Sequence, residues 1–175
     1  PSGNIVVEEV NQTPDSGYVV LGTNMWVGNN HQGVVVKISN SGSVEWERTY
    51  STAYRTAFYG IDNTHDGGFI VCGNTYSNPY GEIYVVKTNS QGDSIWTRKF
   101  GCNLNGVSAG EYYGNSIQQT NDGGYIICGS VSPFFGCSPT ANLLLIKIDG
   151  NGNLTSLSNI PTSSKKKLRK VVDLL

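Results

Sequence analysis

The chain has 175 residues, of which 14% are charged, against roughly a quarter in an ordinary soluble domain. Its 12 basic and 13 acidic residues nearly cancel, so bulk charge gives no argument for binding to nucleic acid. The 22 glycines and 10 tyrosines favour turns and strands, so helical bundles, coiled coils and disordered tails fit poorly. No apolar run approaches the roughly 18 residues of a membrane span, and none is expected.

The start of the chain has neither an initiator methionine nor a signal peptide. The residues Pro1–Asn4 lead straight into the strand-like run Ile5–Val7. We therefore expect a fragment of a longer protein, long enough for one domain with a sizeable core.

One sequence pattern occurs three times, and it organises the whole chain. Each copy combines an Asp-x-Gly turn with an aromatic residue, an apolar run and a final glycine, over residues 11–22, 62–73 and 118–129. A second apolar run then ends in a lysine, which is Lys37, Lys87 or Lys147. Trp46 and Trp96 occupy equivalent positions downstream, where the third repeat has Ser156, so its last strand should pack less well.

Each repeat predicts four short strands. The first strands cover residues 5–11, 58–63 and 114–119, and the second strands end at Gly22, Gly73 and Gly129. The third strands cover residues 33–39, 83–89 and 143–149, and the fourth cover 44–50, 94–100 and 153–158. The second and third strands are apolar without alternation, which predicts cover on both faces. Glycine and asparagine between the strands are typical of hairpin turns.

A four-stranded unit of about 50 residues that repeats is typical of a β-propeller blade. We therefore predict an all-β chain with three antiparallel blades at about 1–52, 53–108 and 109–160, followed by a basic tail at 161–175. Three blades are fewer than the four to eight that normally close a ring, so either more blades precede residue 1 or the arc is open. A β-sandwich is the alternative fold.

In such a blade, the connections divide between two faces, and only one face varies between the copies. The varying connections are 24–32, 75–82, 130–142, 51–57 and 101–113. Function tends to lie on variable loops, so we take their aromatic residues as candidate ligand contacts. These are Trp26, Tyr54, Tyr76, Tyr80, Tyr112, Phe134 and Phe135. Such rings suit sugars or a protein partner, with Asn29, Asn30 and Asn78 available to bond hydroxyl groups. The alternative is that the rings fold back over the blades.

The four cysteines fall into two kinds. Cys72 and Cys128 stand at equivalent positions before a glycine, where a small buried residue is expected, and they predict inert core thiols. Cys102 and Cys137 lie in loops on the same predicted face, so they are candidates for a disulfide, which would fit an oxidising compartment. No cysteine or histidine spacing indicates zinc.

Catalytic motifs are absent from the sequence. His31 and His65 are far apart in the repeat frame, and nothing pairs Asp62, Glu82 or Glu111. The recurring Asp15, Asp66 and Asp122 suggest a turn-stabilising role. The run 149–153 has the alternating oxygen donors of a calcium loop but lacks the distal glutamate. We expect no metal and no cofactor.

The composition changes after Ile160. Residues 165–170 hold five of the 12 basic residues, and without 161–175 the chain keeps 7 basic and 12 acidic residues. Such a run is usually a solvated segment, and an anionic surface is the charge-based alternative.

The segment 166–175 resembles the start of the C-terminal sorting signal of Bacteroidetes proteins that the type IX secretion system exports. The matching residues are Lys166, Lys167, Leu168, Val171, Asp173 and Leu174. The Gly-Arg pair that follows in the signal would lie beyond Leu175. The body also resembles the repeats of such cargo, best over residues 118–125. The resemblance implies contact with the secretion machinery and a secreted or cell-surface destination, without implying an activity.

The leading functional hypothesis is a non-catalytic segment that acts in binding or adhesion, with a glycan or protein ligand on the variable face. The second is the scaffold of a polysaccharide hydrolase or lyase whose catalytic residues lie outside this chain. The third is a passive spacer before the sorting signal.

Overall fold

The computed structural model describes residues 4–27, 30–77, 80–101, 110–133 and 142–161. These residues form twelve strands joined by turns and bends, and the strands pair into three antiparallel sheets of four. The all-β prediction and the prediction of four strands per repeat are therefore confirmed. The described part of the chain contains no helix with the length and apolar character needed to cross a membrane.

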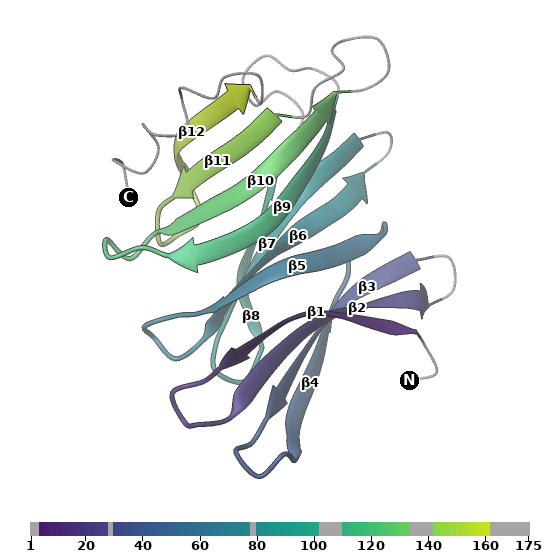
Figure 1. The fold of residues 1–175 in the computed structure, drawn as a ribbon, viewed down its shortest axis with the longest axis vertical. Coiled ribbons are helices and arrows are strands. Elements are labelled where there is room, and N and C mark those ends of the chain that lie inside the picture. Colours follow the sequence, from purple (N-terminus) through teal and green to yellow (C-terminus); the bar gives the residue numbers. More distant parts are fainter. Residues whose placement is uncertain (1–3, 28–29, 78–79, 102–109, 134–141, 162–175) are drawn as a thin grey trace.

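Each sheet follows the order of the chain. Sheet 1 contains β1 (Ile5–Gln12), β2 (Tyr18–Val27), β3 (Asn30–Ile38) and β4 (Val44–Tyr50). Sheet 2 contains β5 (Thr56–Asn63), β6 (Phe69–Ser77), β7 (Tyr80–Thr88) and β8 (Ser94–Phe100). Sheet 3 contains β9 (Gly110–Gln119), β10 (Tyr125–Pro133), β11 (Asn142–Ile148) and β12 (Leu154–Pro161). The sheets succeed one another along the long axis as an open stack (Figure 1).

The variable connections are shorter than the sequence predicts. The predicted loops 24–32 and 75–82 are mostly strand, because pairs such as Asn24 with Gln32 and Thr75 with Glu82 continue the ladders. Strands β5 and β9 likewise begin inside predicted connections, at Thr56 and Gly110. Backbone hydrogen bonds between the strands hold these extensions together. Such bonds do not depend on apolar side chains, so a hairpin can continue beyond the core without a hydrophobic sequence pattern.

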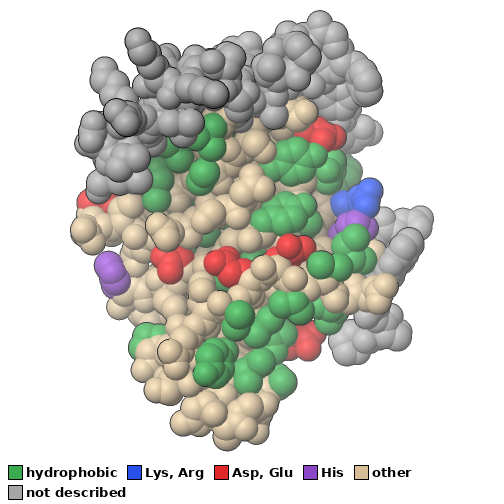
Figure 2. Space-filling model, in the orientation of Figure 1, with side chains coloured by type: hydrophobic (Ala, Val, Ile, Leu, Met, Phe, Trp, Pro, Cys, Tyr) green, Lys and Arg blue, Asp and Glu red, His purple; other side chains and the backbone are tan. Residues whose placement is uncertain are grey.

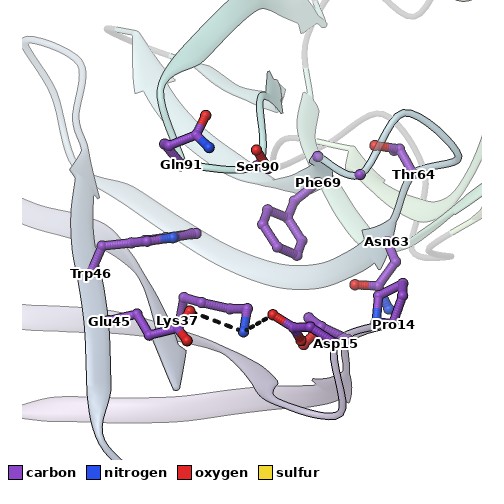
Figure 3. A pocket seen from close by; sticks show the side chains of 13 residues that line it. Pro14, Asp15, Lys37, Glu45, Trp46, Asn63, Thr64, Phe69, Ser90 and Gln91 are labelled. Atoms are coloured by element: carbon purple, nitrogen blue, oxygen red, sulfur yellow. Dashed lines mark hydrogen bonds and ion pairs between the residues drawn. The ribbon is translucent and has the colours of Figure 1, made fainter. Parts of the chain in front are cut away.

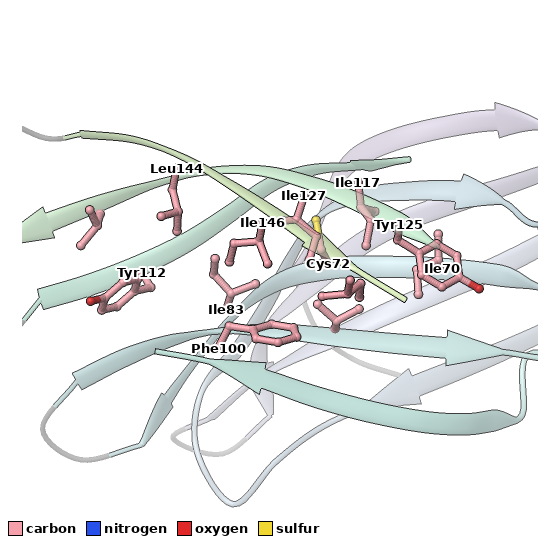
Figure 4. Packing of buried hydrophobic residues seen from close by; sticks show 13 residues of the cluster. Ile70, Cys72, Ile83, Phe100, Tyr112, Ile117, Tyr125, Ile127, Leu144 and Ile146 are labelled. Atoms are coloured by element: carbon pink, nitrogen blue, oxygen red, sulfur yellow. The ribbon is translucent and has the colours of Figure 1, made fainter. Parts of the chain in front are cut away.

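The sheets pack face to face, and the first strand of each later sheet crosses the preceding sheet. Strand β5 contacts β1, β2 and β3, and β9 contacts β5, β6 and β7. Two apolar clusters fill the spaces between the sheets, the larger between sheets 2 and 3 (Figure 4). Within the described residues, sheet 2 alone has a sheet on both faces, as successive buried residues such as Ile70, Val71 and Cys72 show. The prediction of two-sided cover is therefore wrong for sheets 1 and 3, which each have one neighbour.

An aromatic contact joins each pair of neighbouring sheets. The Trp46 ring on β4 meets Phe69 edge-on at 5.8 Å, and Trp96 on β8 meets Tyr125 in the same way at 5.9 Å. On β12 the equivalent Ser156 is exposed, whereas Trp46 and Trp96 are half-buried. The prediction that the last strand packs less well is confirmed, because a serine offers no apolar surface to bury.

Each sheet has a β-bulge on its first strand, at Glu8, Tyr59 and Asn115. The repeated glycine on the second strand lies opposite the bulge, and in sheet 2 a Cβ on Gly73 would overlap the carbonyl oxygen of Ala57. A bulge bends its strand and turns one side chain away from the regular alternation. The final glycine of the repeat is thus required by a close backbone approach.

Replacing Gly73 with alanine should destabilise the protein by more than about 3 kcal/mol, because the added methyl group meets fixed backbone. Gly42→Ala is the matched control. Gly42 has a φ of 87° and open space around it, so only about 1 kcal/mol of backbone strain is expected. Urea unfolding of both variants measures the difference. If both variants lose the same free energy of unfolding, the close approach of the Ala57 carbonyl oxygen to Gly73 would be contradicted.

Candidate functional site

The connections lie at two opposite ends of the sheets. The turn end carries the short turns between β1 and β2, between β3 and β4, and their equivalents in sheets 2 and 3 (Figure 1). The variable end carries the β2–β3 and β6–β7 hairpin connections and the segments that enter β5 and β9. This division follows from the up-and-down strand order.

A lysine and an aspartate hold the turn between the first and second strands of each sheet. In sheet 2, the Asp66 carboxylate accepts hydrogen bonds from Thr64 Oγ1 and the Gly68 amide, at 2.5 and 3.1 Å. Lys87 Nζ lies 2.8 Å from Asp66 Oδ2 and donates to the Thr88 carbonyl oxygen at 2.8 Å. Sheets 1 and 3 repeat these contacts around Asp15 and Asp122. The turn-stabilising role predicted for the three aspartates is confirmed.

These contacts keep the aspartates ionised. Burial by itself would raise the pKa of Asp66, but the bonds from Lys87, Thr64 and the Gly68 amide lower it to about 2. Hydrogen bonds from Lys37 and Thr13 likewise hold the pKa of Asp15 well below its usual range. Bonds from Thr120 and Lys147 do the same for the pKa of Asp122. The three groups are fixed charges of the scaffold, poorly suited to proton transfer near neutral pH.

A groove of about 400 Å³ lies between sheets 1 and 2 at this end (Figure 3). Lys37 extends into it between Asp15, at 2.8 Å, and Glu45, at 3.2 Å, with the Trp46 ring nearby (Figure 3). Because its central ion pair recurs in all three sheets, we assign the groove to the scaffold that joins the sheets.

A second cavity, of about 240 Å³, opens at the variable end of sheets 1 and 2. The bulged residues Glu8 and Tyr59 line it, so the bulges on β1 and β5 place two side chains there. Further polar and aromatic groups come from β3, β6 and the segment before β5. The lining is Val6, Glu8, Thr23, Met25, His31, Arg55, Ala57, Tyr59 and Tyr76. We call this the bulge cavity.

A histidine–arginine contact borders the bulge cavity. Arg55 Nη2 lies 2.9 Å from His31 Nε2, and since a guanidinium can only donate, the imidazole nitrogen accepts. Burial and then the Arg55 charge lower the pKa of His31, which is consistent with a neutral ring. In Figure 2 a basic side chain lies against a histidine on this side of the molecule, with acidic and hydrophobic side chains across the adjoining face.

The tyrosine hydroxyl groups of the cavity belong to a polar network. Burial, and then Tyr76 and Glu8, raise the pKa of Tyr59. The Tyr76 hydroxyl lies 3.5 Å from the Tyr113 hydroxyl, which donates to the Glu111 carboxylate. Burial and then that carboxylate raise the pKa of Tyr113. A polar network therefore runs from the bulge cavity across to sheet 3.

The structure separates the candidate aromatic residues. Tyr76 lines the bulge cavity, and Tyr54 is 45% exposed outside that cavity's lining. Tyr112 is 1% exposed and belongs to the core between sheets 2 and 3, so its ring is not available to a ligand (Figure 4). The reason is that β9 begins earlier than predicted and turns this ring inward. Trp26 and Tyr80 belong to β2 and β7, and their side chains lie outside the described residues.

Other candidates lie outside the described residues altogether. They are Phe134, Phe135, the cysteines Cys102 and Cys137, and the tail residues Lys166, Lys167, Leu168, Val171, Asp173 and Leu174. Of the two cysteines predicted to be core thiols, Cys72 is fully buried, and burial raises the pKa of its thiol. Cys128 is half-buried and free, on the face of sheet 3 that no other sheet of the described residues covers.

Sequence reasoning missed Glu8, Arg55 and Tyr59. Glu8 and Tyr59 fall within or beside predicted first strands, and a bulge changes which way a side chain points without leaving a clear sequence signal. Arg55 lies in a predicted connection, where only aromatic residues were selected. The one available signal was the charge of Arg55 in a segment otherwise poor in charged residues.

No metal site emerges from the described part of the chain. It holds no group of three or more histidine, cysteine, aspartate or glutamate side chains placed to bind an ion. The Asp149 carboxylate, which the sequence places in a calcium-like run, accepts from the Asn151 and Asn153 amides at 2.9 and 2.8 Å. It therefore caps its own turn.

The chain matches no protein-family model and no curated protein.

Asp66→Asn should lower the free energy of unfolding by about 1–2 kcal/mol, because Lys87 remains buried without a counter-charge. The pKa of Asp66 is about 2 against an ordinary 3.8, so its stabilisation is complete above about pH 5 and is lost as pH falls toward 2. The variant should show a flatter acid profile. Urea unfolding at several pH values measures both effects.

Asp122→Asn is the control for Asp66→Asn. Lys147 is 22% exposed where Lys87 is 4%, so its charge stays partly solvated and the loss should be about half as large. A larger loss for Asp122→Asn than for Asp66→Asn would be at odds with the burial argument.

Arg55→Ala should raise the pKa of His31 while leaving it below the ordinary 6.5, because burial, the larger cause of the shift, remains. An NMR titration of the imidazole measures this change. Arg98→Ala removes an arginine from β8 and should leave the His31 titration unchanged. If Arg55→Ala leaves the pKa of His31 unchanged, the contact between Arg55 and His31 does not form in solution.

Proposed function

We propose that this chain is a non-catalytic binding module that takes a glycan at the bulge cavity of its variable end. The observation that carries the proposal is the lining itself. Two half-buried tyrosines, a carboxylate, a guanidinium and an imidazole converge on one small cavity.

The chemistry of these groups suits a hydroxyl-rich ring. Tyr59 and Tyr76 offer flat apolar rings with hydroxyl groups at their edges, so each can contact a sugar face and also form hydrogen bonds. Glu8 accepts hydrogen bonds from hydroxyl groups, and Arg55 donates them. A purely apolar partner would remove water from these polar groups without offering hydrogen bonds in return, which costs binding energy.

We propose further that the sheets are blades of an incomplete or open β-propeller. Three equivalent four-stranded sheets support this, together with first strands that cross the neighbouring sheet and an aromatic contact repeated between sheets. In this arrangement the bulge cavity lies between two blades, since its lining comes from sheets 1 and 2.

The second candidate function is a scaffold within a polysaccharide-acting hydrolase or lyase. Of the three acidic residues outside the repeated turns, Glu82 and Glu111 lie near the variable end and Asp62 lies near the turn end, and each already has a partner in the chain. Asp62 accepts from the Gln119 amide at 2.8 Å, Glu82 lies 3.7 Å from Lys99, and Glu111 accepts from Tyr113. These contacts favour binding over catalysis for the described residues.

We also propose secretion to the cell surface or beyond through the type IX machinery, with the tail 161–175 as the start of the sorting signal. The resemblance of residues 166–175 to that signal supports this proposal. A secreted or surface location would place the bulge cavity among extracellular glycans.

A glycan array probed with the whole chain tests the binding proposal. Tyr76→Ala and Arg55→Ala should each weaken binding to the recognised glycan about tenfold or more, the loss expected for about 1.4 kcal/mol. The bound glycan should be recovered intact, since the proposal includes no bond cleavage.

Tyr54→Ala supplies the matched control, because Tyr54 is an exposed tyrosine at the same end but outside the cavity lining. It should bind like the unaltered chain. If both cavity variants bind the glycan normally, or if only Tyr54→Ala loses binding, the bulge cavity is not the glycan-binding site.

A further inference from the structure

The sheets are joined by one set of contacts that occurs twice. In the first junction, Trp46 packs on Phe69 while Arg48 lies 5.8 Å from the centre of the Trp46 ring. The β7–β8 turn of sheet 2 packs against the Trp46 ring, and a Cβ on Gly92 in this turn would lie 2.7 Å from that ring. Arg48 Nε also contacts Asp93 at 3.3 Å. Sheet 1 therefore contributes a Trp-x-Arg pair, and sheet 2 contributes an aromatic residue and a glycine turn.

The second junction has the same parts. Trp96 packs on Tyr125, and Arg98 lies 5.5 Å from the centre of the Trp96 ring. A Cβ on Gly152 would lie 2.8 Å from Arg98, and Arg98 donates to the Asn151 carbonyl oxygen at 2.8 Å. Because two junctions with different neighbours share this chemistry, it defines how these repeats recognise one another.

The accepting half of this junction lies open on sheet 1. Tyr18 occupies the position of Phe69 and Tyr125 in the strand register, and Gly42, at the position of Gly92 and Gly152, has open space around it. The register places Ile5, Val7 and Val10 on the same face of sheet 1. We call this the free accepting face, and it consists of Ile5, Val7, Val10, Tyr18 and Gly42.

The exposure of these residues marks the face as an interface without its partner. The four apolar side chains are between 42% and 64% exposed. Their equivalents in sheet 2 are buried to 3% exposure or less, and these are Thr56, Phe58, Ile61 and Phe69. A contiguous row of exposed apolar side chains on one face indicates a binding surface.

Sheet 3 does not carry the matching donor pair. Ser156 pairs with Lys147 and Ser158 with Leu145, as Trp46 and Arg48 pair with Lys37 and Val35 in sheet 1. A second copy of this chain therefore offers the free accepting face two serines in place of the tryptophan and arginine. Self-association through this contact is disfavoured, because neither the ring nor the guanidinium contact can form.

We infer that the free accepting face binds another four-stranded repeat of the same kind whose fourth strand carries a Trp-x-Arg pair. The partner's tryptophan packs on Tyr18, and its arginine lies against the Gly42 turn. The face accepts such a repeat and rejects one that ends in Ser-x-Ser. The Trp-x-Arg pair therefore determines which repeat can pack before another in an array.

A donor version of the full chain tests this inference. Ser156→Trp with Ser158→Arg installs the pair on sheet 3, and Val10→Asp closes the donor chain's own accepting face. Mixed with the unaltered chain, this donor should form a one-to-one complex with a Kd below about 100 µM in sedimentation equilibrium. A chain with Val10→Asp alone is the matched control and should not associate.

The accepting side is tested in the same assay. Val10→Asp in the acceptor should abolish the complex, since Val10 is exposed in the free chain and its loss costs little stability. Failure of a folded donor to bind, or binding that survives Val10→Asp in the acceptor, would overturn the inference. Circular dichroism and thermal unfolding establish that the donor is folded.

A single-chain variant covers the case in which the donor does not fold. Residues 5–55 are duplicated in front of Ile5, so that the copied Trp46 and Arg48 can reach the free accepting face through the native connection. Hydrogen exchange of the β1 and β2 amides should slow at least tenfold relative to a control with serines at the copied Trp46 and Arg48. Equal exchange in the two variants would contradict the inference. These readouts do not depend on the bulge cavity or on any glycan.

Discussion

Face-to-face cover of apolar sheets is the constraint on which this structure depends. The middle strands of each repeat carry apolar residues on both faces, and a four-stranded sheet in water cannot bury either face alone. Stacking solves this for sheet 2, whose β6 and β7 are buried on both sides. The Trp46–Phe69 and Trp96–Tyr125 contacts fix how far each sheet slides over the next. The outer faces of sheets 1 and 3 are the surfaces on which a further sheet could pack.

The polar groups of the repeat serve the same stacking. In sheets 1 and 2 the lysine at the end of the third strand is buried, and an unpaired charge there would be costly. The aspartate of the preceding turn pairs with it, and the turn's threonine and glycine amide complete the coordination of that carboxylate. The most recognisable part of the repeat is thus explained by one lysine ammonium group that pairs with the aspartate of the turn. Its recurrence in all three sheets places it in the scaffold rather than in a ligand site.

The bulge cavity differs because its residues do not recur. Glu8, Tyr59 and Asn115 share the bulged position, yet they are three different side chains. The scaffold therefore presents one backbone feature and lets its chemistry vary from repeat to repeat. His31 and Arg55 add a contact at the first junction. Such variation on a constant backbone is what a binding surface requires.

The amino-acid sequence determined the repeat, its four strands, the turn role of Asp15, Asp66 and Asp122, and the weaker last strand at Ser156. These features rest on local patterns, because strand alternation, turn chemistry and a missing aromatic residue are visible within a few positions. The tertiary structure decided that Tyr112 is core, that the predicted loops 24–32 and 75–82 are mostly strand, and that Glu8 and Tyr59 share a cavity. These outcomes depend on where β-bulges fall and on which face meets a neighbour. Both are set by contacts between residues about 50 positions apart, which no local pattern encodes.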